Sequence, residues 1–276
     1  MLAQRIITAM VGIAATILIV YYGQWLFALA VLLLTLLAWH EYYNMMVRRQ
    51  VEIAYYLGML NIIFIWGTAW LGNSKETVAV ILLAAFLLLA KTVISHSRFN
   101  LQDAVYTFTG VCYIGLAFAH LVLLRFTDNS TVIATGLGGS QPAGAAYLWL
   151  AFIGTWASDT FAFFVGSTLG KHKLAPAVSP GKTWEGVIGG GAGSCLALLA
   201  LGWLWHLPLL HCVCIGLVIG FVAPLGDLVE SAMKRFAGVK DSGRLLPGHG
   251  GVLDRFDSIL FTVPAVYYYI YIFFLR

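Results

Sequence analysis

The sequence predicts an all-α, polytopic integral membrane protein with about nine transmembrane helices and a cytoplasmic N-terminus. Of its 276 residues, 61% are hydrophobic and only 10% are charged, whereas a soluble domain usually carries about 25% charged residues. The apolar residues gather in runs near the ~20 residues that a helix needs to cross a bilayer. This composition excludes a soluble protein. The net charge of +4 indicates membrane topology rather than binding to nucleic acid.

Nine apolar runs account for the expected spans. The joins near Gly23 and His206 are so short that the helices on either side must be antiparallel. We expect a single membrane domain over residues 1–276, with N-terminal helices to about residue 130 and catalytic helices and loops from about residue 146. The expected spans are Ile6–Tyr22, Trp25–Tyr43, Ala54–Leu71, Thr77–Ile94, Val105–Phe126, Ala146–Leu169, Trp184–Trp205, Pro208–Val229 and Ser258–Leu275.

The basic residues predict the orientation of these spans. With the N-terminus inside, the inner loops and helix ends hold 13 of the 16 Lys and Arg residues. The outer side holds only Lys75, Arg125 and Arg276. Because cytoplasmic loops carry an excess of positive charge, we expect the charged loops before the seventh and ninth spans to face the cytoplasm.

The most highly charged part of the sequence reads "SAMKRFAGVKDSGRLLPGHGGVLDRFDS" (Ser231–Ser258). It holds five cations, three carboxylates and one histidine between the last two expected spans. Carboxylates at the edge of a membrane are costly and need a partner or a purpose. For any one of them, an ion pair that anchors a helix end would be sufficient.

Three carboxylates taken together predict a metal site. Asp227 lies at the end of the eighth expected span, and Asp254 and Asp257 open the ninth at a spacing that places both on one helical face. Mg²⁺ prefers oxygen ligands, and the neighbouring cations would bind the phosphates that the metal binds. The glycines of "PGHGG" (Pro247–Gly251) can expose backbone N–H groups to an anion, although a tight turn would need them equally.

A second basic inner loop reads "GKHKLAPAVSPGKTWEGV". Its "GKT" (Gly181–Thr183) resembles the end of a phosphate-binding P-loop, but Pro176 stands where that motif needs glycine, and no strand is expected before it. We therefore exclude a P-loop. What remains is a basic turn before a helix whose N-terminus can attract phosphate, or a plain topology signal.

Other features receive no catalytic role from the sequence. The run "WHEYYNMM" places His40 and Glu41 at an inner helix end, where an ion pair or a lipid headgroup contact would explain them. The glycines of "EGVIGGGAGS" predict a close helix-packing face. The four cysteines lie in apolar runs and are expected to be free, buried thiols.

The charged stretch resembles the signature of the phosphatidate cytidylyltransferases, also called CDP-diacylglycerol synthases. The family pattern runs Ser-x-x-Lys-Arg, four residues, Lys-Asp, then Pro-Gly-His-Gly-Gly and Asp-Arg-x-Asp, and every element is present between Ser231 and Asp257. The second loop is similar to the family's Ser-Pro-x-Lys-Thr-x-Glu-Gly, with Gly181 where a lysine is common. The resemblance is tight in the C-terminal half and loose in the first half.

This resemblance implies an enzyme that transfers the cytidylyl group of CTP to phosphatidate from the inner leaflet, for phospholipid biosynthesis. It implies Mg²⁺, with a second cation such as K⁺, a bacterial-type inner membrane location with the active site facing the cytoplasm, and a homodimer. The implied metal ligands are Asp227, Asp254 and Asp257. The implied catalytic phosphate contacts are Lys182, Lys240, His249 and Arg255. The implied supporting substrate contacts are Ser179, Thr183, Lys234, Arg235 and Asp159.

Three alternatives stay open. A related CTP-dependent lipid kinase or an archaeal-lipid cytidylyltransferase would use similar groups. An ion-coupled transporter would use Asp159 and Asp227 as ion sites inside the membrane. That alternative predicts an internal repeat, and none is visible in the sequence.

Overall fold

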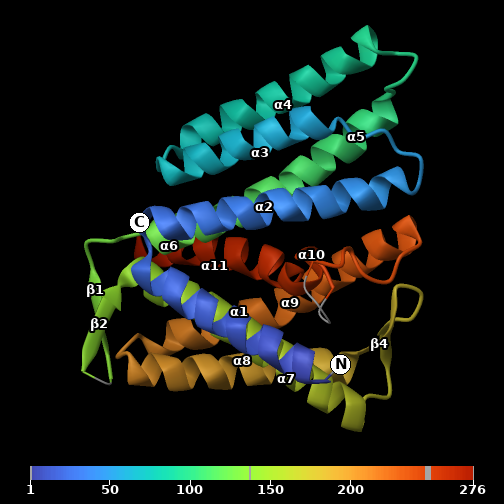
Figure 1. Ribbon diagram of the computed structural model, residues 1–276. Helices are drawn as coiled ribbons and strands as arrows, with labels where there is room; N and C mark the ends of the chain where they lie inside the picture. The colour runs from blue at the N-terminus through green and yellow to red at the C-terminus, as the bar shows by residue number, and fades with distance from the viewer. Residues whose placement is uncertain (1, 137, 246–249, 276) are drawn as a thin grey trace. The chain divides into compact units, whose positions relative to one another are not determined.

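The computed structural model describes residues 2–136, 138–245 and 250–275, and helices form most of this part of the chain (Figure 1). The prediction of an all-α protein is confirmed, because each of the expected apolar spans lies in a helical segment. The helical segments are α1 (Leu2–Tyr22), α2 (Gln24–Val47), α3 (Tyr55–Trp70), α4 (Ser74–Ile94), α5 (Leu101–Gly110), η1 (Val111–Leu116), α6 (Ala117–Phe126), α7 (Ala143–Leu169), α8 (Trp184–Leu204), α9 (Leu209–Ala237), α10 (Leu253–Phe256) and α11 (Ile259–Phe274).

The lengths of these helices fit a multi-pass membrane protein. Within the described residues, six helical stretches are long and apolar enough to cross a bilayer, and two shorter apolar helices cover Met10–Tyr22 and Ile259–Phe274. The fifth expected span is continuous through α5, η1 and α6, with a π-helical turn at Val111–Leu116. The number of nine crossings and the inward N-terminus stay predictions.

Two short hairpins interrupt the helical pattern. The loop between α6 and α7 pairs β1 (Val132–Thr135) with β2 (Gly139–Pro142) in antiparallel register. The basic loop between α7 and α8 pairs β3 (Lys173–Ala175) with β4 (Ser179–Thr183). The expectation of no strand before "GKT" was therefore wrong. The motif nevertheless lies on β4 rather than in a glycine-rich loop, so the exclusion of a P-loop stands.

The chain divides into two compact units. The first contains Met1–Leu123 and Met233–Arg255, and the second contains Leu124–Ala232 and Phe256–Arg276. The boundary near residue 123 lies close to the division that the sequence suggests. The charged segment from Met233 to Arg255 belongs with the N-terminal helices, although the sequence places it with the C-terminal ones.

In the first unit, aromatic side chains fix the C-terminal half of α2. Trp39 is fully buried, stacks on Tyr42 and Tyr55, and donates a hydrogen bond from Nε1 to the Tyr55 carbonyl at 3.1 Å. The Tyr42 hydroxyl donates to the Tyr106 carbonyl on α5 at 2.8 Å. These bonds satisfy polar atoms that would otherwise be costly inside a membrane protein. They hold the turn of α2 that carries Glu41.

In the second unit, α7 packs along α8, with α11 against α7 (Figure 1). Small residues permit the close α7–α8 approach, because a Cβ on Gly190 or Gly193 would collide with Ser158 or Phe161 on α7. The predicted glycine packing face is therefore confirmed. Between α7 and α11, the buried hydroxyls of Thr155 and Thr262 form a hydrogen bond of 2.8 Å.

Candidate active site

Asp254 lies at the centre of a hydrogen-bond network in the first unit. Its Oδ1 accepts from Lys234 Nζ at 2.8 Å, and its Oδ2 accepts from the backbone N–H groups of Ser242 and Gly251, both at 2.8 Å. The Ser242 hydroxyl also lies 2.9 Å from Oδ2. Burial acts to raise the pKa of Asp254, but the hydrogen bonds from Lys234 and Gly251 outweigh it and lower this pKa to about 2. The side chain is therefore a carboxylate at neutral pH.

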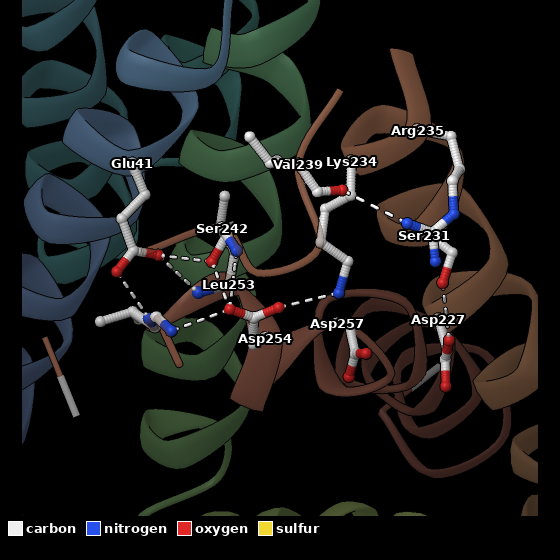
Figure 2. A network of polar contacts seen from close by, with 12 residues as sticks. Glu41, Asp227, Ser231, Lys234, Arg235, Val239, Ser242, Leu253, Asp254 and Asp257 are labelled. Carbon is white, nitrogen blue, oxygen red and sulfur yellow. Dashed lines mark hydrogen bonds and ion pairs between the residues drawn. The ribbon is translucent and has the colours of Figure 1, made fainter. Parts of the chain in front are cut away.

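The same network contains Glu41, to which the sequence assigned no role. Figure 2 shows this α2 side chain beside the charged segment. Its Oε1 accepts from the Val252 N–H at 2.8 Å, and its Oε2 accepts from the Leu253 N–H and the Ser242 hydroxyl, both at 3.0 Å. Glu41 itself is only 6% exposed. The available sequence signal was a Glu among aromatic residues at a helix end, in "WHEYYNMM", and it did not identify the partners.

A pocket of about 640 Å³ lies beside this network in the first unit. It combines the C-terminal end of α2 with the turn that follows α9, and three of its side chains are the exposed cations Arg48, Lys240 and Arg244. Among the described residues that line it, Asp241 is the one acidic side chain. The surplus of positive charge and the open shape suit an anionic group such as a phosphate.

The second unit contains a separate cluster around Asp227 on α9. Lys182 at the end of β4 forms an ion pair with Asp227 at 2.6 Å, and both side chains are about three-quarters buried. The Ser231 hydroxyl donates to the other Asp227 oxygen at 3.2 Å. The sequence assigned Lys182 and Asp227 to different tasks, phosphate binding and metal binding, and the structure pairs them directly.

Asp159 and Asp257 complete this cluster. The Ser258 hydroxyl donates to Asp159 at 3.3 Å, and Gly226 lets the backbone of Asp257 approach α9, because a Cβ on Gly226 would collide with the Asp257 carbonyl. Burial raises the pKa of Asp257 to about 7, and the charges of Asp227 and Asp159 add to this effect. Asp159, Asp227 and Asp257 thus place three carboxyl groups around the ammonium group of Lys182.

Hydrogen bonds to two side chains fix the β3–β4 hairpin to the start of α8. Thr183 is buried and caps α8, accepting a hydrogen bond from the Gly186 N–H at 3.1 Å. Glu185 lies within hydrogen-bond distance of His172 Nδ1, at 2.6 Å, and also accepts from the His172 backbone N–H. These contacts orient the hairpin so that Lys182, between them in sequence, reaches Asp227.

The structure thus divides the predicted site residues between the two units. Lys234, Asp254 and the exposed residues Arg235, Lys240 and Arg255 belong to the first. Asp159, Ser179, Lys182, Thr183, Asp227 and Asp257 belong to the second. His249 lies outside the described residues.

The carboxylates of the predicted metal site have the donor chemistry that Mg²⁺ prefers, but they do not form a preformed set of ligands. Carboxylate oxygens suit Mg²⁺, and a bound cation would offset the charges of Asp227 and Asp159, which add to the effect of burial in raising the pKa of Asp257. Among the described residues, however, no group of three or more His, Cys, Asp or Glu side chains is arranged to hold a metal ion. The assignment of Asp227, Asp254 and Asp257 as ligands stays a prediction.

Long apolar helices, together with a basic pocket suited to an anionic group, define a multi-pass membrane protein that carries charged clusters. The chain belongs to the cytidylyltransferase family, whose model matches residues 3–273. It is 34% identical over 266 residues to a phosphatidate cytidylyltransferase of Staphylococcus epidermidis, covering 95% of this chain and 96% of the relative. The corresponding proteins of Staphylococcus haemolyticus and Staphylococcus aureus are 34% and 33% identical, with the same coverage.

Proposed function

We propose that the protein transfers the cytidylyl group of CTP to phosphatidate, giving CDP-diacylglycerol and pyrophosphate. The observation that carries this proposal is the match to phosphatidate cytidylyltransferases over 95% of the chain. The basic pocket of the first unit supports it, because both substrates are polyanions that need cationic partners.

In this reaction a phosphate oxygen of phosphatidate forms a bond to the α-phosphorus of CTP. The bond from that phosphorus to the oxygen bridging the α- and β-phosphates breaks, and pyrophosphate leaves with the electron pair. A phosphomonoester is largely ionised near pH 7, since its second pKa is about 6. No strong general base is required, and the task of the protein is to position two anions and stabilise developing charge.

The residues of each unit suit one part of this task. Arg48, Lys240 and Arg244 in the first unit would bind phosphate oxygens through charge-assisted hydrogen bonds. Asp227 and Asp257 in the second unit would hold Mg²⁺, with Lys182 beside them as a further phosphate contact. Mg²⁺, when bound, neutralises charge on phosphate oxygens during phosphoryl-type transfer.

The proposed location is a bacterial inner membrane, with the charged segments facing the cytoplasm, where CTP is available. The organisms of the relatives support a bacterial setting, and the distribution of basic residues supports the orientation. Phosphatidate would enter from the inner leaflet, with its acyl chains remaining among apolar helices.

Pyrophosphate release tests the proposal. Protein purified in mild detergent receives CTP, Mg²⁺ and either phosphatidate or diacylglycerol, with and without a chelator. We expect pyrophosphate only with phosphatidate and Mg²⁺, in a molar ratio to CDP-diacylglycerol of about one. Folded protein that releases no pyrophosphate from CTP and phosphatidate would refute the proposed function.

A further inference from the structure

We infer that Glu41 on α2 is a positioning residue for the charged segment that carries Asp254. Its role would be to hold the backbone at Gly251–Leu253 and the Ser242 side chain in the geometry that the reaction needs. The kinetic part of this inference rests on the proposed function, whereas the contact itself does not. The inference assigns a role to α2, which lies in the N-terminal half of the chain, where the sequence identified no site residues.

The geometry argues for a dedicated acceptor. Glu41 lies 201 residues before Ser242 and 211 before Val252, yet its two oxygens accept three hydrogen bonds of 2.8–3.0 Å from the segment. All of these atoms belong to the first unit. An ionised carboxylate has only acceptors, and every atom facing Glu41 in these bonds is a donor. The side chain thus replaces the water that the Val252 and Leu253 N–H groups lose on burial.

Two glycines of the charged segment lie directly against the Glu41 carboxylate. A Cβ on Gly251 would collide with Glu41 Oε2 and the Ser242 hydroxyl, and a Cβ on Gly243 would collide with Glu41 Oε1. Both glycines belong to the charged segment, so the backbone encloses the carboxylate from two sides. These positions need glycine because any side chain would collide with the Glu41 carboxylate, in addition to any requirement of the turn.

Ser242 transmits the position of Glu41 to Asp254. Its hydroxyl lies 3.0 Å from Glu41 Oε2 and 2.9 Å from Asp254 Oδ2, so a single proton is shared between two carboxylates. The second oxygen of Asp254 accepts from Lys234 (Figure 2). A displacement at Glu41 is therefore passed to Asp254 and Lys234, two residues that the family resemblance assigns to the reaction.

The substitution Glu41→Gln tests this role with minimal change in volume. In either orientation of the amide, its NH₂ group faces an N–H donor, either at Val252 or at Leu253. One backbone donor is then unpaired and repelled, at a cost that exceeds the loss of an ordinary hydrogen bond. A displacement of about 1 Å at a reacting group can cost about 100-fold in rate.

Asp103→Asn is the matched control. Asp103 is also a buried carboxylate in the first unit, 5% exposed, and it accepts from the backbone N–H groups of Glu52 and Asn100 without touching the charged segment. Its loss should lower thermal stability to a similar extent. The carboxylate of Glu41→Asp retains two acceptors and should restore part of the activity lost in Glu41→Gln.

The experiment measures hydrogen–deuterium exchange of the peptide containing Val252 and Leu253, together with kcat, at a temperature where all variants are folded. We expect faster exchange in that peptide and a kcat about 100-fold lower for Glu41→Gln, with wild-type exchange there and near wild-type kcat for Asp103→Asn. Wild-type kcat in folded Glu41→Gln, or an equal loss in Asp103→Asn, would overturn the inference. If the wild-type protein itself forms no product, the proposed function fails instead, and unchanged exchange at Val252 and Leu253 in Glu41→Gln would still overturn the positioning role.

Discussion

At the scale of single residues, the two oxygens of Asp254 accept hydrogen bonds from one ammonium group, two backbone N–H groups and one hydroxyl. These donors keep the side chain ionised, and its pKa stays at about 2 although burial alone would raise it. A carboxylate held in this way has a fixed orientation. A role in metal binding or in positioning Lys234 would depend on this charge.

Asp254→Asn should therefore reduce turnover by at least about 100-fold while the protein remains folded, because the amide presents a donor to donors and removes the charge facing Lys234. The measurement is kcat in mild detergent, with size-exclusion chromatography as the test of folding. The control is Asp128→Asn, a half-buried residue in the turn after α6 that accepts hydrogen bonds from Ser130 and Thr131 and lies outside both charged clusters. Near-normal turnover in Asp254→Asn would contradict the site.

At the scale of elements, the contact between α2 and the charged segment depends on the absence of side chains at Gly243 and Gly251. Gly251→Ala should destabilise the protein by about 1–3 kcal/mol, since a methyl group would be forced against Glu41 and Ser242. The measurement is the midpoint of thermal unfolding in detergent, together with turnover.

The matched control for this change is Gly67→Ala on α3, where a Cβ meets nothing within 4 Å. Because alanine is the better helix former, this variant should be neutral or more stable by about 0.5–1 kcal/mol. A wild-type melting midpoint in Gly251→Ala, or an equal decrease in both variants, would show that the described packing around Glu41 is wrong.

The elements that the sequence predicted well are those set by local composition. A run of about 20 apolar residues is a property of adjacent residues, so the expected spans and the helices agree to within a few residues at most ends. The hairpin β3–β4 was missed because its strands are only three and five residues long and contain Pro180 and Gly181, which disfavour strands. Whether such short strands pair depends on their tertiary contacts and not on their amino-acid composition.

The site was predictable only in part, for the same physical reason. A charge in an oily sequence marks a costly group, which identified Asp227, Asp254 and Asp257. It does not show which partner satisfies each one, and the partners lie far away in the chain. Lys182 forms its ion pair with Asp227 on a different element, and Glu41 bonds to Ser242, which follows it by 201 residues. Neither partnership can be read from local sequence.

At the scale of the whole molecule, the distribution of basic residues predicts that Lys75 lies outside and Arg98 inside. We expect Lys75→Cys, in a background with the four native cysteines replaced by alanine, to react with a membrane-impermeant maleimide in intact cells. Arg98→Cys should react only after the membrane is opened. The reverse pattern would contradict the inward orientation of the charged loops.

The central claim, cytidylyl transfer by a membrane protein with a charged site, is tested most directly by following two phosphorus atoms of CTP. The purified protein receives CTP labelled separately on the α- and γ-phosphates, with phosphatidate and Mg²⁺, and the lipid phase is extracted and counted. We predict α-label in the lipid and γ-label in aqueous pyrophosphate, with both signals abolished by a chelator. Label from the γ-phosphate in the lipid would identify a lipid kinase instead and would contradict the proposed reaction.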